Sequence, residues 1–201
     1  MDFNSAIFLF LFLPAFLAVY FIAPGKIKNI VLVLFSLMFY TWGDKILVLL
    51  LIASAFMNFF GAKYIRHGNR VIGLIAMLIF NIGLLGYFKY YNFGVDSLNG
   101  LFGIFHLNGL LKPLSSLALP LGISFYTFRA IAYVTDVYKG KTMPSGNFLE
   151  FSTWFTLFPL ISAGPIVRYA DIQHQLTIKN INSERFTEAL PVLSRVWQRR
   201  Y

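Results

Sequence analysis

The chain contains no cysteine. It therefore forms no disulfide, and it offers no thiolate to a metal ion or to nucleophilic catalysis. Charge is also scarce, because charged residues make up 12% of the 201 residues and only 8 residues are acidic. Soluble domains carry roughly 25% charged residues. The deficit argues against a soluble globular protein.

Two further absences narrow the chemistry. No Gly-rich phosphate loop of the Walker type is present, so the sequence does not support ATP-driven transport by this chain alone. The three histidines, His67, His106 and His174, are scattered and show no metal-ligand spacing. We therefore expect no bound metal or cofactor, and we assign none of the three histidines as a catalytic base.

Apolar residues dominate what remains. Hydrophobic residues make up 58% of the chain, and 23 residues are phenylalanine. A transmembrane helix needs about 20 mostly apolar residues. The sequence predicts an all-α, multi-pass transmembrane helical bundle, with Pro14 kinking the first helix. The predicted spans are residues 3–23, 29–42, 46–62, 71–88 and 117–135.

Two other stretches do not read as simple spans. Residues 90–113 mix aromatic side chains with polar ones, and residues 148–165 are short and interrupted by Pro159. The first is expected to be a re-entrant or interfacial segment, and the second a re-entrant segment or a broken helix. Residues 1–176 are thus predicted to form the membrane domain. Residues 177–201 form a polar, basic tail that is too polar to span.

Positive charges follow a regular pattern along the chain, whose formal net charge is +9. Lys26 and Lys28 lie in one loop, and Lys63, Arg66 and Arg70 mark another on the same predicted side of the membrane. Short loops rich in Lys and Arg face the cytoplasm, which predicts an extracytoplasmic N-terminus. The expected partner is the lipid bilayer, and no basic, aromatic-interleaved face of the kind that binds nucleic acid is visible.

A polar group interrupts the apolar stretch near residue 129. Arg129, Tyr133 and Asp136 have the spacing i, i+4 and i+7, which places them on one helix face. A guanidinium facing lipid is costly, so Arg129 is expected to face protein or a polar cavity. Two interpretations remain open. The face forms the wall of a substrate channel, or Arg129 makes a structural contact to an acid or a carbonyl that locks two helices.

A second polar group follows a predicted chain break. Gly164 and Pro165 favour a break, which either shapes a cavity or ends a helix. Arg168 lies just beyond it. Its guanidinium suits an anionic or phosphate-bearing ligand, or it anchors the chain at the membrane interface.

Several motifs together resemble one family. They read Leu-Pro-Leu-Gly-Ile-Ser-Phe-Tyr-Thr-Phe at 119–128, Asp-Val-Tyr-Lys-Gly at 136–140 and Ala-Gly-Pro-Ile-Val-Arg-Tyr at 163–169, with Phe-Tyr-Thr-Trp-Gly at 39–43. In this order they resemble the membrane-bound O-acyltransferases, specifically the alginate O-acetyltransferase branch. The resemblance covers roughly residues 1–190.

The resemblance implies a ring of membrane helices around a funnel in the bacterial cytoplasmic (inner) membrane. It implies transfer of acetyl groups to hydroxyls of an exported, alginate-like polysaccharide. Acetyl-CoA or another acyl donor is expected, as are other polysaccharide-acetylation proteins as partners. In this family a histidine in a Trp-His-Gly type motif acts as the general base.

The chain departs from the family pattern near its end. Trp197 is followed by Gln198 rather than histidine, and Pro191 interrupts the helix expected there. We therefore expect an N-terminal portion of an acyltransferase that is inactive on its own. The alternatives are a non-catalytic membrane assembly or binding subunit, and half of a transporter.

Overall fold

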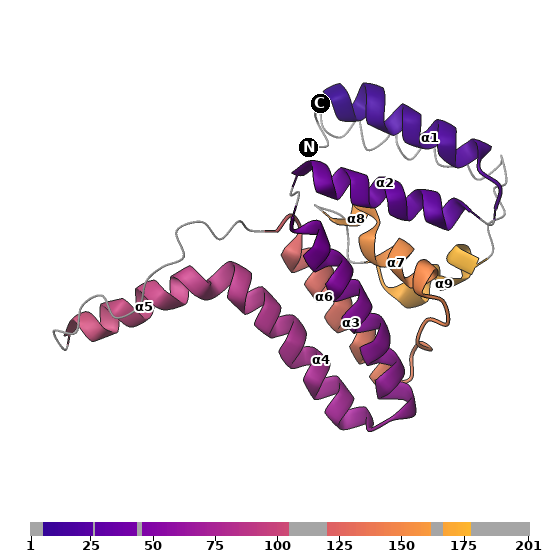
Figure 1. Cartoon of the computed structure of the whole chain (residues 1–201). Coiled ribbons are helices and arrows are strands. Elements are labelled where there is room, and N and C mark those ends of the chain that lie inside the picture. Colours follow the sequence, from indigo (N-terminus) through magenta and orange to yellow (C-terminus); the bar gives the residue numbers. More distant parts are fainter. Residues whose placement is uncertain (1–5, 26, 44–45, 105–119, 162–166, 178–201) are drawn as a thin grey trace, which may run out of the picture.

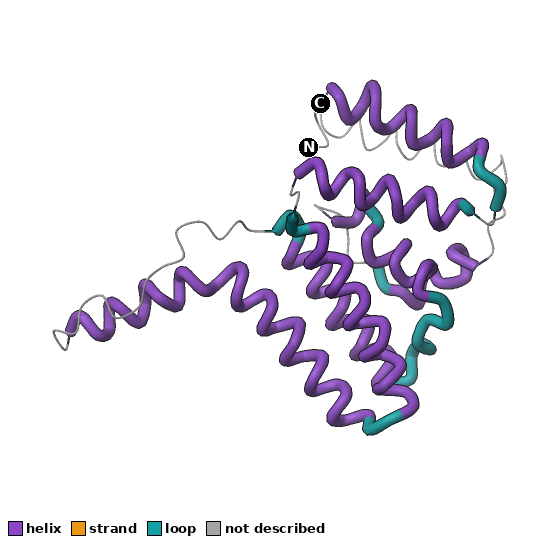
Figure 2. The backbone as a smooth tube through the Cα atoms, viewed as in Figure 1, coloured by secondary structure: helices purple, strands orange, loops and turns teal. Residues whose placement is uncertain are grey.

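The computed structural model describes residues 6–25, 27–43, 46–104, 120–161 and 167–177. All regular elements in these ranges are helical, which confirms the predicted all-α class (Figures 1 and 2). In chain order they are η1 (Phe8–Phe12), α1 (Leu13–Ile22), α2 (Lys28–Gly43), α3 (Val48–His67), α4 (Arg70–Leu85), η2 (Gly86–Tyr90), α5 (Tyr91–Ile104), α6 (Ile123–Tyr138), α7 (Phe148–Thr156), α8 (Phe158–Ile161) and α9 (Tyr169–Thr177).

The first helix begins with a widened turn. Residues of η1 form a π-helical turn, and Pro14 lies just after it within α1. Proline has no backbone N–H to donate to the preceding turn. The wider turn accommodates this missing donor at Pro14. Helix α2 lies alongside α1 (Figure 1).

A phenylalanine cluster joins this helix pair to the rest of the body. Its rings come from η1, α1, α2 and α8, and neighbouring centroids lie 5.3–6.1 Å apart. Edge-to-face and stacked arrangements at these distances are favourable. The members are Phe8, Phe12, Phe16, Phe35, Phe39 and Phe158.

Helices α3 and α4 form a tight hairpin against which α6 packs. Helix α3 runs to His67, beyond the expected boundary at 62, so Lys63 and Arg66 are helical and the connecting turn is short. Asn69 starts α4 because its side-chain oxygen accepts hydrogen bonds from the backbone N–H groups of Val71 and Ile72. The hairpin supplies one wall of the core around α6.

Two helices in the described part are long and apolar enough to cross a membrane: Val48–His67, with 20 residues, and Arg70–Tyr90, with 21. The helices Phe8–Ile22 and Lys28–Gly43 are apolar but shorter. The predicted span 117–135 overlaps α6, and its first three residues lie outside the described ranges. The multi-pass arrangement stays a prediction.

The two stretches expected to be re-entrant take different forms. Helix α5 continues from α4 through η2 as an arm that leads away from the body (Figure 1), and residues 105–113 lie outside the described part. Residues 148–161 form two short helices, α7 and α8, that meet at Leu157. The tail from residue 178 onward also lies outside the described ranges.

Candidate functional site

The predicted polar face of α6 is buried. Arg129, Tyr133 and Asp136 are 1%, 1% and 7% exposed, respectively. All three face the segments that follow α6 in the chain, since their side chains contact residues between 145 and 169. The i, i+4, i+7 spacing thus produces the single face that the sequence predicts.

Arg129 binds the carbonyl end of α7. Its Nη1 donates a hydrogen bond of 3.2 Å to the backbone oxygen of Trp154. In a continuing helix, that oxygen would accept from the N–H of Phe158, four residues on. Here the Phe158 N–H instead donates to the Ser36 hydroxyl at 3.2 Å. Arg129 therefore supplies the donor that the helix end has lost.

The same helix end favours a positive charge for two further reasons. The last carbonyls of a helix lack intrahelical partners and carry the negative end of the helix dipole. Pro159 has no N–H to offer the Phe155 carbonyl one position further on. Among the described residues, Nε and Nη2 of Arg129 have no hydrogen-bond partner. The contact to the Trp154 carbonyl is of the helix-locking kind, and the channel interpretation stays a prediction.

Tyr133 lies in an aromatic cluster next to Arg129. Its ring centroid is 4.9 Å from that of Phe151, 5.7 Å from Trp154 and 5.3 Å from Tyr169. Its hydroxyl accepts a hydrogen bond of 2.9 Å from the backbone N–H of Ser145. Tyr133 therefore fixes the loop between α6 and α7 against α6.

Tyr169 extends the cluster towards the surface. Burial raises the pKa of its hydroxyl, the hydrogen bond with Ser145 opposes that shift, and the charge of Glu150 adds to it. The hydroxyl therefore stays protonated at neutral pH. It can donate or accept a hydrogen bond but does not supply an anion.

Asp136 and Arg168 form the solvent-facing edge of this group. Arg168 Nη1 lies 3.8 Å from Asp136 Oδ1, and the two side chains are 55% and 11% exposed. Such a long, partly exposed pair contributes little stability, typically about 0–1 kcal/mol. Arg168 is thus free to exchange its partner for another anion. Gly164 and Pro165, the predicted break, lie outside the described residues.

Sequence reasoning overlooked a cluster of cations that the fold brings together. Arg70 Nη2 donates to the backbone oxygen of Tyr138, the last residue of α6. This contact places the α3–α4 turn beside the end of α6. We call the exposed cations there, Arg66, Arg70, Lys139 and Lys141, the basic end. The Lys-Gly-Lys sequence after a predicted span was the available signal.

Of the histidines, His67 lies next to Arg66 at the basic end, and His174 lies on α9. His67 and His174 are exposed, and His106 lies outside the described ranges. In the part of the chain that the structure describes, no three His, Asp or Glu side chains are placed to hold a metal ion. The polar face of α6 consists of Arg129, Tyr133 and Asp136, which contact the segments that follow α6.

Known proteins match this chain over nearly its whole length. "Probable alginate O-acetylase AlgI" of Pseudomonas aeruginosa is 37% identical over 193 residues, covering 94% of this chain and 37% of that protein. The protein of the same name from Azotobacter vinelandii is 36% identical, covering 94% and 38%. "Peptidoglycan O-acetyltransferase" of Helicobacter pylori is 32% identical, covering 89% and 39%.

No family model and no solved structure matches the chain. The 201 residues span less than two fifths of the length of the three relatives.

Proposed function

Because this chain is related to the alginate O-acetylases across 94% of its length, we propose that it forms the N-terminal helical part of a membrane O-acetyltransferase. The whole enzyme would transfer acetyl groups to hydroxyls of an exported polysaccharide. Identity of 37% over 193 residues is the observation that carries the proposal. The names of the relatives include both alginate and peptidoglycan as acceptors, so the acceptor class is an extracytoplasmic polysaccharide.

We further propose that the helices form a multi-pass bundle in the bacterial cytoplasmic membrane. The two longest helices have the length and composition of spans. Helix α4 exposes isoleucines along one side, as lipid contact allows. The basic end gathers Lys and Arg from two separate turns, which supports a cytoplasmic position for it. The N-terminus would then be extracytoplasmic.

In this proposal the 201 residues bind and position, and the chemistry lies elsewhere in the enzyme. Acetyl transfer needs a general base near the acceptor hydroxyl. The two described histidines, His67 and His174, are exposed. The relatives are much longer than this chain, so a further segment has room to supply the base. The acyl donor, such as acetyl-CoA, would meet that segment.

Within this chain, Asp136 and Arg168, which lie beside the basic end, are the residues best placed to meet a substrate that arrives from the cytoplasmic side. Arg168 is 55% exposed, and its pairing with Asp136 is long. Arg129 and Tyr133 would support this edge from inside by holding α6 against α7 and the following loop. In this proposal these residues form one wall of the substrate channel. Arg129 and Tyr133 would support the wall from inside, and Asp136 and Arg168 would contact the substrate.

Complementation tests the proposal directly. Alginate-producing Pseudomonas aeruginosa lacking its own O-acetylase would receive the 201-residue chain, the segment of the relative that has no counterpart here, or both. Acetyl esters on exported alginate would be measured by proton NMR, and each polypeptide would be quantified in the membrane fraction. We expect esters only when both polypeptides are present.

Two results would count against the proposal. Absence of esters when both polypeptides accumulate in the membrane would refute the enzymatic role. Esters from the 201-residue chain alone would refute the division of labour, because the chain would then hold its own catalytic base. The segment of the relative expressed alone is the matched control for residual activity.

A further inference from the structure

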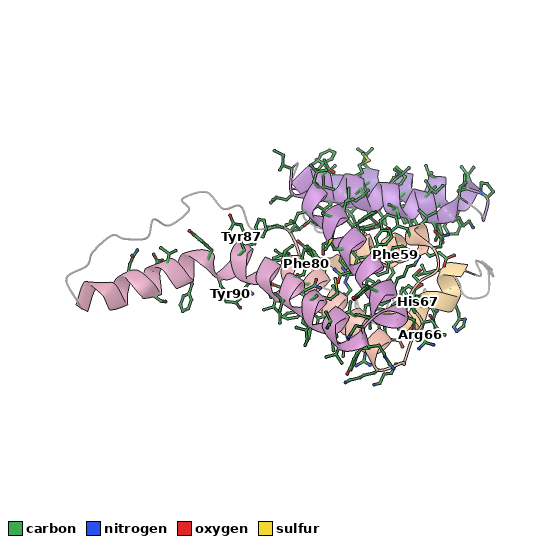
Figure 3. All side chains as sticks on the ribbon, turned by 60° about the horizontal axis from the view of Figure 1, so that its bottom comes forward. Phe59, Arg66, His67, Phe80, Tyr87 and Tyr90 are labelled. Atoms are coloured by element: carbon green, nitrogen blue, oxygen red, sulfur yellow. The ribbon has the colours of Figure 1, made fainter. Side chains whose placement is uncertain are left out.

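The basic end carries positive charge that no acidic group of the described structure neutralises. Its four cations are exposed, and none lies within 4 Å of a carboxylate in the described ranges, where Arg168 and Asp136 form the ion pair. Figure 3 shows Arg66 and His67 at this end, with Tyr87 and Tyr90 far along the helix that starts beside them. A surface with exposed positive charge of this kind attracts anions.

Local structure fixes these cations relative to one another. The Arg70 guanidinium donates to the Tyr138 carbonyl and lies 5.6 Å from the centre of the Tyr138 ring. Beyond Tyr138 the chain reverses at Gly140, whose φ of 73° is readily adopted only by glycine. The Lys141 N–H then donates to the Asp136 carbonyl at 2.9 Å, which completes a Schellman turn. The turn holds its two lysines beside the α3–α4 hairpin.

An apolar stripe starts at the basic end. Ile72, Ile75, Ile79 and Ile82 are 59%, 51%, 67% and 57% exposed. Their spacing of three, four and three residues puts them on one face of α4. The stripe begins two residues after Arg70. The stripe and the basic end thus lie at the same end of α4, but Arg70 is about 160° round the helix from the isoleucines, on the side that packs against α6.

We propose that the basic end binds the phosphate groups of anionic phospholipids. Clusters of Lys and Arg next to membrane helices attract anionic headgroups. The basic end lies where the two candidate spans, Val48–His67 and Arg70–Tyr90, meet. Phospholipid headgroups surround the ends of membrane-spanning helices, which is why we assign the surface to a lipid.

This proposal requires only that the chain lies in a membrane, and it is independent of acetyl transfer. Its test therefore uses neither donor nor acceptor. The purified 201-residue chain in an uncharged detergent would be titrated with phosphatidylglycerol and with phosphatidylcholine of the same chain length. Native mass spectrometry would report the apparent Kd for each lipid. We expect tighter binding of phosphatidylglycerol, weakening as salt is raised.

Substitutions test whether the basic end itself accounts for the preference for phosphatidylglycerol. We expect Arg66→Gln to weaken phosphatidylglycerol binding about fivefold and the triple variant R66Q/K139Q/K141Q to weaken it by about that factor for each charge. Arg66→Lys keeps the charge and should keep the affinity. Lys89→Gln removes one exposed charge at the far end of the α4–η2 helix and is the matched control.

Three outcomes would overturn the proposal. The triple variant could bind phosphatidylglycerol as tightly as the parent chain. Inorganic phosphate or glycerol phosphate at millimolar concentration could displace the lipid, which would mark a site for a soluble anion. An acidic partner protein could bind through the same cations while the chain shows no preference between the two lipids.

Discussion

Asn58 and Asn81 exchange hydrogen bonds across the contact between α3 and α4. Asn81 Nδ2 donates to Asn58 Oδ1 at 2.9 Å, and Asn58 Nδ2 donates to Asn81 Oδ1 at 3.2 Å. Both side chains are fully buried, with exposures of 0% and 1%. Each amide also donates to a carbonyl four residues back in its own helix. The pair thus satisfies itself inside an apolar hairpin and fixes the register of its two helices.

Breaking this pair on one side should destabilise the hairpin. We expect Asn81→Leu to lower the stability of the chain in detergent by about 1–2 kcal/mol, because it leaves the side-chain oxygen Oδ1 of Asn58 buried without a donor. Asn58→Leu should act similarly. Thermal unfolding followed by circular dichroism would measure both variants.

The double variant N58L/N81L is the informative control for the amide pair. Replacing both polar partners by apolar side chains leaves no unsatisfied group, so the double variant should be more stable than the sum of the single effects predicts. Simple additivity would show that the two amides do not act as a pair.

Two glycines on α4 provide a second test, which asks how closely α3 and α4 pack. One of them is crowded by α3, and the other is not. A Cβ added at Gly73 would lie 2.9 Å from Ile65 Cγ1 and 3.3 Å from Ile65 Cα, whereas a Cβ at Gly83 would meet nothing within 4 Å. We expect Gly73→Ala to destabilise the chain by about 1–3 kcal/mol through overpacking. Gly83→Ala should be neutral or stabilise by up to about 1 kcal/mol through helix propensity. Equal effects at the two positions would contradict the observed close approach of α3 and α4.

Much of the helical content was predictable because it follows from local pattern. The apolar runs of the sequence form α-helices. The resemblance to alginate O-acetyltransferases is confirmed by 37% identity over 94% of the chain. The spacing of Arg129, Tyr133 and Asp136 placed them on one face, and all three are buried there. Apart from the resemblance, each of these predictions depends only on residues near one another in sequence.

The missed contacts depend on distant partners. Arg129 reaches the Trp154 carbonyl because Ser36, 122 residues from Phe158, takes the competing N–H. Pro159 indicates locally that α7 ends nearby, but no local pattern reveals which hydroxyl lies beside that end. The asparagine pair was visible as two polar residues in apolar stretches, but their pairing depends on helix register.

Membrane orientation gives a third prediction. A dual reporter of alkaline phosphatase and green fluorescent protein would be fused after Gly43 and, separately, after His67. We expect phosphatase activity from the first fusion and fluorescence from the second, because the Lys- and Arg-rich turn should stay in the cytoplasm. The opposite pattern would invert the proposed topology and would place the basic end outside the cell. Two fluorescent fusions would show that α3 does not cross the membrane.

The role of Arg129 can be resolved by a charge-selective pair of substitutions. A buried arginine at membrane depth costs about 2.5–3.5 kcal/mol, while an unpaired Trp154 carbonyl would cost about 1–3 kcal/mol. Arg129→Met removes the first cost and incurs the second, so its stability in detergent should stay within about 1 kcal/mol of the parent chain. Arg129→Lys keeps a charge that is more strongly hydrated and lacks the planar guanidinium, and we expect it to be the less stable of the two variants. If the methionine variant instead unfolds at a much lower temperature than the lysine variant, the positive charge itself holds α6 and α7 together. In that case the attraction between this charge and the carbonyl end of α7 outweighs the cost of burying it.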